Sequence, residues 1–326
     1  MKFLLLFICL FCLISCTSHK DLSEDESSVD FCVVNIVQPK NNLLTDSDEE
    51  KGTRATDIGS NLISSMSFEH GDTIGIFTSN GSQIPFIPNI PVGTYVSLVT
   101  LRAEGWMTKL SNIYALYLPY NFYNRRYDNI PWNGKKVIEQ SETNSKIHVG
   151  KYWILGSDTV VQNNTDGIFH TSLTMLGTEV RVRVVVPVQN YYVKMALVAP
   201  TKAFSSQGYY DLFDRAHGQP YYSTDSTDHV MLTITNPSLI LAQKKFICFF
   251  YFPEVDLSNR TLGCYIWDKD GNCYYGDAQT GSSGDWKRNT VNDIYFPSMA
   301  LVTTPKLNLN PWEEEDTCST CYPVAF

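Results

Sequence analysis

The stretch Val180-Arg181-Val182-Arg183-Val184-Val185-Val186 carries the clearest structural signal in the sequence. Valine is β-branched and fits an extended backbone better than a helix. Because successive side chains of a strand point to opposite faces, Val180, Val182 and Val184 share one face and the two arginines share the other. The pattern predicts a strand with one buried face and one face in contact with water.

Similar short strands are predicted on both sides of this stretch. Residues 264–275 (CYIWDKDGNCYY) place a turn segment, Asp268 to Gly271, between two aromatic runs, which is typical of a β-hairpin. The other predicted strands cover residues 31–37, 68–79, 95–101, 112–120, 151–158, 191–198, 230–235, 245–252, 290–296 and 299–309. Helix signals are weak and are limited to residues 57–65 and 237–243. Many short strands between turn residues predict an all-β protein built from β-sandwiches.

The composition bounds the number of domains and the class of partner. Of 326 residues, 43 % are hydrophobic and 13 % are aromatic, which is enough for sizeable cores. This length favours two domains, with a boundary near residue 165 in the polar segment 161–167 (VQNNTDG). The formal net charge is −9, so nucleic acid phosphates should repel the chain and no nucleic acid partner is predicted.

The N-terminus has the pattern of an export signal. Lys2 is followed by an apolar run from Phe3 to Ile14, which is shorter than the roughly 20 residues of a membrane-spanning helix. The run ends at Ser15-Cys16, and a small residue before a cysteine at this point resembles the bacterial lipobox. Residues 1–15 are then the signal peptide and Cys16 is the lipid attachment site. An ordinary secretory signal is the alternative interpretation.

Two polar segments surround the first predicted strand. Residues 16–30 are acidic and lack an apolar period, so they are expected to be a disordered tether between the lipid and the folded protein. Their acidic residues are similar to a surface-export signal of some lipoproteins, although a plain spacer explains them equally well. Residues 40–57 are charged and contain glycine, and such a segment is expected to be exposed and open to proteolysis.

Five segments resemble the fimbrillin superfamily, the subunits of polymeric surface fimbriae of certain anaerobes. They are the lipobox at Cys16, residues 68–77 (FEHGDTIGIF), 114–120 (YALYLPY), 168–182 (which begins with IFH and ends with VRV) and 284–291 (GDWKRNTV). Their order and spacing cover most of residues 31–312. The resemblance implies two tandem transthyretin-like β-sandwich domains, here residues 31–165 and 166–326. It also implies a fimbrial, structural or adhesive role at the cell surface, with a lipid anchor in the outer membrane.

The resemblance further implies a route of assembly. In the family, an arginine-specific protease cuts the loop behind the first strand, which then leaves, and the C-terminal strand of another subunit takes its place. Here residues 31–37 match the strand that leaves and Arg54-Ala55 matches the cut, while an uncut exposed loop is the alternative. Residues 299–310 would donate a strand, but Pro305 interrupts them. The implied partners are other fimbrial subunits and a surface receptor or glycan; a stalk, anchor or tip position stays open.

Six cysteines remain once the signal is removed and Cys16 carries lipid. They are Cys32, Cys248, Cys264, Cys273, Cys318 and Cys321. Cys264 and Cys273 flank the predicted hairpin turn and would form a disulfide if the register placed them opposite each other. Cys318 and Cys321 form a Cys-x-x-Cys motif in a polar tail, where a local disulfide or two free thiols are expected rather than a redox centre. This tail is unusual for the family.

No catalytic constellation is predicted, and the chain is expected not to be an enzyme. The six histidines lack the spacing of a metal site, and neither a metal nor a cofactor is predicted. Residues 268–272 (DKDGN) place glycine fourth, whereas a calcium-binding EF-hand loop needs glycine sixth and glutamate twelfth, so a hairpin turn is favoured. Ser282 and Ser283 lack the pattern of a nucleophile elbow.

A surface glycan-binding lipoprotein that does not polymerise is the alternative function. Tyrosines cluster at residues 120–123, at Tyr209-Tyr210 and at Tyr221-Tyr222. Aromatic rings can stack on sugar rings, but packing at strand edges is the simpler interpretation of these clusters.

Overall fold

The structure is a computed structural model that describes residues 29–42, 66–77, 83–104, 116–118, 126–134, 138–145, 154–157, 161–162, 168–214 and 221–303. In these ranges the regular structure consists of β-strands and one 3-10 turn, Gly281–Gly284. None of the described residues belongs to a helix long and apolar enough to cross a membrane. The all-β prediction is confirmed.

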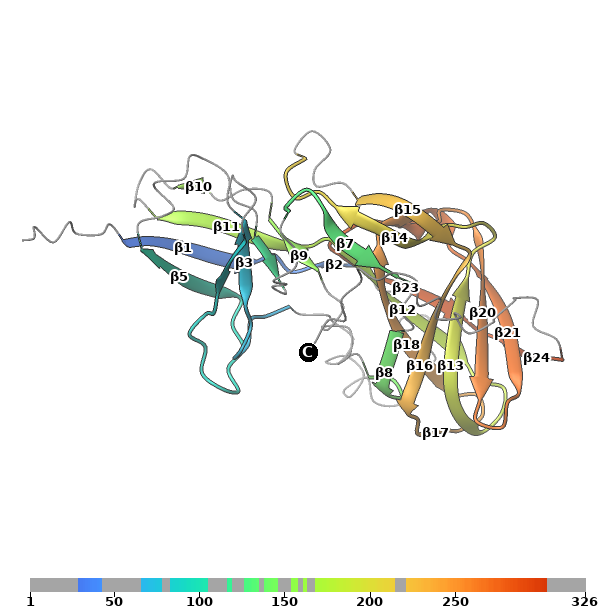
Figure 1. Cartoon of the computed structure of the whole chain (residues 1–326). Helices are drawn as coiled ribbons and strands as arrows, with labels where there is room; N and C mark the ends of the chain where they lie inside the picture. The colour runs from blue at the N-terminus through green and yellow to red at the C-terminus, as the bar shows by residue number, and fades with distance from the viewer. Residues whose placement is uncertain are drawn as a thin grey trace, which may run out of the picture.

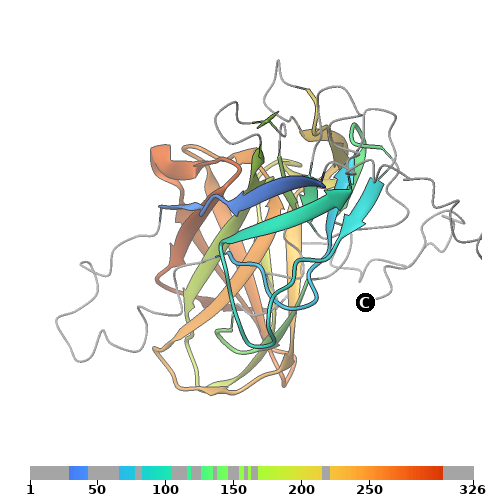
Figure 2. The same ribbon diagram turned by 90° about the vertical axis from the view of Figure 1, so that its left-hand side faces the viewer.

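The N-terminal lobe, at the left of Figure 1, is built on one eight-stranded sheet. Its strands follow the order β4-β3-β6-β9-β11-β1-β5, and β10 pairs with β11. The strands are β1 (Val29–Ile36), β3 (Ile74–Phe77), β4 (Gln83–Phe86), β5 (Leu98–Glu104), β6 (Leu116–Leu118), β9 (Leu155–Gly156), β10 (Val161–Gln162) and β11 (Phe169–Met175). Figure 2 shows β1 in blue running alongside β5. Val34, Ile76 and Leu173 are among the buried side chains of this lobe's core.

The C-terminal lobe is a sandwich of a four-stranded sheet, β18-β12-β23-β2, and a seven-stranded sheet, β24-β21-β20-β13-β16-β8 with β17 attached to β13. The strands are β2 (Lys40–Asn42), β8 (Ile138–Glu142), β12 (Gly177–Val185), β13 (Asn190–Val198), β16 (His229–Asn236), β17 (Leu239–Ile240), β18 (Lys245–Pro253), β20 (Thr261–Asp268), β21 (Cys273–Gln279), β23 (Thr290–Phe296) and β24 (Ala300–Val302). Val182 and Phe250 of the smaller sheet and Leu197 and Ile266 of the larger one meet in the core between them.

Two small sheets complete the described structure. One has the order β15-β14-β7, and the other pairs β19 with β22. Their strands are β7 (Ile130–Asn133), β14 (Phe204–Tyr210), β15 (Tyr221–Thr227), β19 (Val255–Asp256) and β22 (Asp285–Trp286).

Strand pairing crosses the chain division that the sequence predicts near residue 165. β7 and β8 precede that point but pair with β14 and β16, and β11 follows it but pairs with β1. Phe249 and Tyr251 of β18 also pack in the core of the N-terminal lobe. The domain limits therefore remain a prediction, and the two lobes exchange segments on both sides of residue 165.

The helix expected over residues 237–243 is wrong. β17 pairs instead with the start of β13, with Asn190 opposite Ile240 and Tyr191 opposite Leu239. Gln243 follows with φ 62°, a left-handed conformation that ends the extended segment before β18. Backbone pairing with β13 outweighs the weak helical pattern. The other helix candidate, residues 57–65, lies outside the described residues.

The hairpin around residues 268–272 is confirmed, but its register excludes the disulfide between its cysteines. Cys264 lies opposite Gly276, whereas Cys273 lies opposite Trp267. Cys264 packs in the core of the sandwich and Cys273 belongs to a separate cluster that includes Tyr265, so the two thiols lie on opposite faces of the sheet. Both are free and buried. The register therefore does not meet the condition for a Cys264–Cys273 disulfide, which the sequence had left open.

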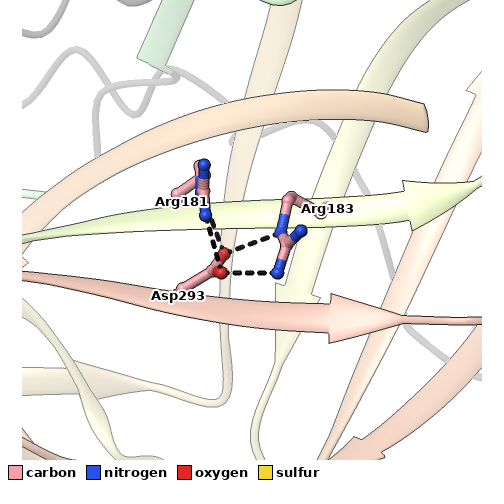
Figure 3. A network of polar contacts seen from close by, with 3 residues as sticks. All are labelled: Arg181, Arg183 and Asp293. Carbon is pink, nitrogen blue, oxygen red and sulfur yellow. Dashed lines mark hydrogen bonds and ion pairs between the residues drawn. The ribbon is translucent and has the colours of Figure 1, made fainter. Parts of the chain in front are cut away.

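The strand at residues 180–186 is confirmed as part of β12, but its arginine face is not in contact with water. Figure 3 shows Arg181 and Arg183 of β12 converging on Asp293 of β23. Their Nε atoms donate to Oδ1 at 3.0 Å each, and their Nη2 atoms donate to Oδ2 at 2.8 and 2.6 Å. All three side chains are buried. Bidentate pairing offsets the cost of removing these charges from water.

Candidate functional site at the N-terminal strand

β1 occupies an interior position in the eight-stranded sheet. It pairs antiparallel with β5 on one side and parallel with β11 on the other. Val34, for example, lies opposite Val99 of β5 and Thr171 of β11. A strand paired on both sides closes two backbone ladders, so its loss would leave two neighbouring strands with unpaired N–H and C=O groups.

The side chains of β1 alternate between the core and the outer face. Cys32, Val34 and Ile36 are 1 %, 0 % and 3 % exposed, whereas Val33 and Asn35 between them are half-buried. Burial raises the pKa of the Cys32 thiol to about 12, so the group stays protonated and packs as a small apolar side chain. β1 thus fills three apolar core positions with Cys32, Val34 and Ile36.

The chain beyond β1 continues into the other lobe. Gln38 Nε2 donates to Met66 O at 2.7 Å, and Met66 N donates to Gln38 Oε1 at 2.8 Å. Lys40 N then donates to Asn289 O at 2.9 Å, and β2 pairs in parallel with β23. Residues 29–42, named here the N-terminal strap, therefore complete a sheet in each lobe.

A polar network fixes the far end of the N-terminal strap. Asn42 Nδ2 donates to Asn292 Oδ1 at 3.0 Å. Asn292 Nδ2 donates in turn to the hydroxyls of Thr178 and Thr290 at 2.8 and 2.7 Å. Asn292, Thr178 and Thr290 are buried, so β23 contributes two buried polar systems, this network on one face and the Asp293 ion pairs on the other.

Sequence reasoning finds β1 but misses β2 and the side-chain pairing of Gln38. β2 has the sequence Lys40-Asn41-Asn42, which predicts a loop on composition alone. Its extended conformation comes from the open edge of β23, which is separated from it by about 250 positions in the chain.

Several residues that the sequence singles out lie outside the described residues. They are the lipid attachment site Cys16, the cleavage site Arg54-Ala55, the tail cysteines Cys318 and Cys321, and the aromatic segment 120–123. Lipid attachment, cleavage and the chemistry of the tail cysteines therefore stay predictions.

The tyrosine clusters separate into a core pair and a surface pair. Tyr210 is 1 % exposed, and it lies beside Tyr221 with ring centroids 4.9 Å apart. Tyr209 and Tyr222 stack at 5.1 Å with an interplanar angle of 29°, and Tyr222 is 38 % exposed. Of the aromatic side chains on this sheet, Tyr222 is exposed, and Tyr209, Tyr221 and Trp132 are half-buried.

In the turn after β20, the carboxylate of Asp268 is hydrogen-bonded by other side chains of the protein. Asp268 is 2 % exposed, and its Oδ2 accepts hydrogen bonds from Asn190 at 2.8 Å, from Asn272 at 2.9 Å and from Tyr274 at 3.2 Å. Among the described residues there is no group of three or more His, Cys, Asp or Glu side chains placed to hold a metal ion.

Comparison with known proteins gives structural similarities only. No protein-family model and no curated protein matches the sequence. A proposed cell adhesion protein of Parabacteroides distasonis is similar over 86 % of this chain and 93 % of its own, with 10 % identity and a TM-score of 0.44. The fimbrial anchor protein Mfa2 of Porphyromonas gingivalis is similar over 84 % and 95 %, with 13 % identity and a TM-score of 0.32. The tip fimbrial protein Mfa3 of the same species is similar over 76 % and 81 %, with 12 % identity and a TM-score of 0.33.

Proposed function

We propose that this chain is a structural or adhesive subunit of a cell-surface fimbria that assembles by strand exchange. It is exported as a lipoprotein anchored in the outer membrane through Cys16, and it has no enzymatic role. Cleavage between Arg54 and Ala55 frees the N-terminal strap, and a strand of another subunit replaces β1. The position of β1, paired on both sides and inserted through Cys32, Val34 and Ile36, carries the proposal.

The energetics of β1 favour replacement over simple loss. Without β1, the sheet would expose the apolar side chains that Cys32, Val34 and Ile36 cover and the ladder groups of β5 and β11. An incoming strand with small apolar residues at alternate positions restores both the ladders and the core, which is β-strand addition at an open edge. Because the proposed cleavage site follows the N-terminal strap in sequence, one cut separates β1 from the part of the chain that forms the rest of the sheet.

A disulfide lock between β1 and β5 tests the proposal. Asn35 and Leu98 lie directly opposite each other, Asn35 is half-buried and Leu98 is 53 % exposed, so Asn35→Cys with Leu98→Cys should form a bridge without disturbing the core. Under oxidising conditions the locked protein, treated with an arginine-specific protease, should be cut but should give no SDS-resistant ladder in unheated gels. Adding a reductant should restore the ladder.

The cut itself is tested by Arg54→Gln, with Lys51→Gln in the same loop as the matched control. Only Arg54→Gln should prevent both the new N-terminus at Ala55 and the ladder. Ladders that form from the oxidised lock, or from Arg54→Gln, would overturn the strand-exchange proposal.

The alternative function, glycan binding without polymerisation, rests on the exposed stack of Tyr209 and Tyr222. It predicts retention on polysaccharide affinity gels that is lost in Tyr209→Ala and Tyr222→Ala. Tyr95→Ala is the control, because Tyr95 is 67 % exposed and does not belong to the sheet that carries the stack. If Tyr209→Ala and Tyr222→Ala were retained as well as the parent protein, the Tyr209–Tyr222 stack would be excluded as a glycan-binding site.

A further inference from the structure

The connection between β4 and β5 presents apolar side chains to solvent instead of burying them. Residues 87–98, named here the apolar loop, form the teal segment that extends from the sheet of the N-terminal lobe in Figure 1 before the chain enters β5. The exposed side chains are Ile87 at 72 %, Val92 at 80 %, Tyr95 at 67 % and Leu98 at 53 %. Single exposed apolar residues are ordinary, but four of them on one loop indicate a surface that contacts a partner.

Contacts with the body of the lobe hold the apolar loop in place. Ile90 is 4 % exposed and packs in the core of the N-terminal lobe, and its carbonyl oxygen lies 2.8 Å from Nδ1 of His70. Phe68 and Val96 exchange two backbone hydrogen bonds of 2.7 and 3.0 Å. The exposed side chains are therefore positioned before a partner arrives, which lowers the entropy cost of binding.

Several backbone N–H groups of the apolar loop are absent or already paired. Proline has no backbone N–H, and Pro88 and Pro91 are two of the residues of the loop. Ile90 N donates to Pro88 O at 3.0 Å, Thr94 N donates to Pro91 O at 3.1 Å, and Val96 is bonded to Phe68. An unpaired N–H group is costly to move from water into an apolar medium, so this backbone lowers the cost of placing the loop where there is no water.

The turn at the tip of the apolar loop carries its most exposed side chain. Gly93 has φ 77°, a left-handed conformation that glycine adopts without strain, and Val92 directly before it is 80 % exposed. The tip is therefore apolar and points away from the core.

The charge pattern around the apolar loop indicates the chemistry of the partner. No charged residue occurs in the sequence from Thr73 to Leu101, although 18 % of the chain is charged and its net charge is −9. Binding anchors between proteins are mostly Trp, Tyr and Arg, whereas Leu and Val are under-represented among them. Aliphatic side chains favour the acyl region of a bilayer, and tyrosine favours its boundary with water. The loop therefore fits a lipid surface better than a protein.

Two carboxylates mark where the uncharged surface ends. Glu69 and Asp72 form one turn, in which Glu69 N donates to Asp72 Oδ2 at 2.8 Å. Because Phe68 pairs with Val96, this turn lies at the base of the loop, close to Tyr95. Carboxylates are costly to bury in lipid, so only the part of the loop beyond this turn can enter the acyl region.

We infer that the apolar loop inserts into a lipid surface, with Ile87 and Val92 among the acyl chains and Tyr95 at the level of the headgroups. The loop is then a second point of membrane contact besides the proposed anchor at Cys16, and it holds the N-terminal lobe against the membrane. The inference does not depend on strand exchange, because the inserted side chains belong to neither β1 nor its partner β11.

Vesicle flotation tests the insertion in residues 16–326 with Cys16→Ser, which lack both the signal peptide and the lipid. This parent should float with phosphatidylcholine vesicles, and raised salt should not release it, because no ion pair takes part. Ile87→Ser with Val92→Ser should lower the partition coefficient about tenfold, since two aliphatic side chains are lost. The matched control is Leu239→Ser with Leu241→Ser, at 45 % and 52 % exposed positions of the C-terminal lobe, and should bind like the parent. Thermal unfolding of both variants should be unchanged.

A tryptophan placed at the tip measures the depth of insertion. Brominated acyl chains should quench the added fluorescence of Val92→Trp but not that of Leu241→Trp. A parent that stays unbound, equal binding of the two serine variants, or an unquenched Val92→Trp would overturn the inference. Sedimentation without vesicles distinguishes a protein partner: a dimer of the parent that Ile87→Ser with Val92→Ser dissociates would mean that a second copy covers the loop, and would also overturn it.

Discussion

The hydroxyl of Tyr251 lies 2.9 Å from the backbone nitrogen of Gly177 and accepts its hydrogen bond at the point where the chain passes from the N-terminal to the C-terminal lobe. The same hydroxyl accepts a hydrogen bond from Ile154 N at 3.2 Å. Tyr251 belongs to β18 of the sandwich but packs in the core of the other lobe. One phenol therefore satisfies buried backbone groups from two parts of the chain.

Tyr251→Phe should destabilise the protein by about 1–3 kcal/mol, because two buried N–H groups lose their acceptor while the ring keeps its packing. Urea unfolding followed by tryptophan fluorescence measures the change. Tyr95→Phe is the matched control at an exposed tyrosine and should leave the midpoint unchanged. Equal midpoints for both variants would show that the hydroxyl of Tyr251 does not link the lobes.

Gly177→Ala should be destabilising because there is no room for a side chain. A Cβ atom at this position would lie 2.6 Å from Phe252 O and 2.7 Å from the Tyr251 hydroxyl. Overpacking of this kind costs about 1–3 kcal/mol. In a double-mutant cycle, Tyr251→Phe should reduce the cost of Gly177→Ala only in part, since it removes the hydroxyl but leaves the ring atom Cζ at 2.7 Å and Phe252 O at 2.6 Å. Additive effects would mean that the contacts with Phe252 O and with the ring carbon limit this position.

Asp293→Asn should cost about 3–5 kcal/mol, because Arg181 and Arg183 would remain buried with their shared charge partner removed. The control is Asp285→Asn, where the carboxylate is 40 % exposed and pairs with Lys287 on the surface. A surface pair contributes about 0–1 kcal/mol, so the control should unfold almost as the parent protein does. Chemical denaturation of both variants at the same pH and ionic strength makes the comparison, and similar losses would contradict a buried role for Asp293.

Cys32 should report whether β1 is in place. Burial raises the pKa of its thiol to about 12, and the folded protein should react with maleimide at pH 8 much more slowly than the unfolded chain. Release of β1 after cleavage should make Cys32 reactive, while Cys248 and Cys264 in the sandwich core stay protected as internal controls. Mass spectrometry of labelled peptides gives the three rates. Persistent protection of Cys32 after cleavage would show that β1 stays in the sheet.

The same shift gives a pH dependence of stability. The unfolded thiol titrates near its ordinary pKa of 9.0 and the folded one near 12, so the folded state binds more protons between these values. The free energy of unfolding should therefore fall as the pH rises from about 9 toward 12, and this part of the loss should be absent in Cys32→Ala. If the free energy of unfolding fell equally with pH in the parent protein and in Cys32→Ala, Cys32 would be excluded as a cause of the pH dependence.

The local sequence pattern was sufficient to predict single strands and single turns. The alternation at Val180, Val182 and Val184 and the turn from Asp268 to Gly271 predict elements that the structure confirms. The β-branched run at residues 31–37 likewise predicts the strand that the structure places as β1. Such elements follow from side-chain shape and backbone preference within a few residues.

Pairing between distant segments decided the rest. The sequence alone placed Arg181 and Arg183 in water, because the partner that lets them be buried, Asp293, is more than 100 positions away. Register, which no local pattern encodes, put Cys264 and Cys273 on opposite faces of one sheet. The sequence by itself determined that the chain forms strands and which strand comes first. Only the tertiary structure decided that this strand lies between β5 and β11. The physical reason is that a strand can pair with any open sheet edge, and the edge that it takes is the one where its apolar face becomes buried.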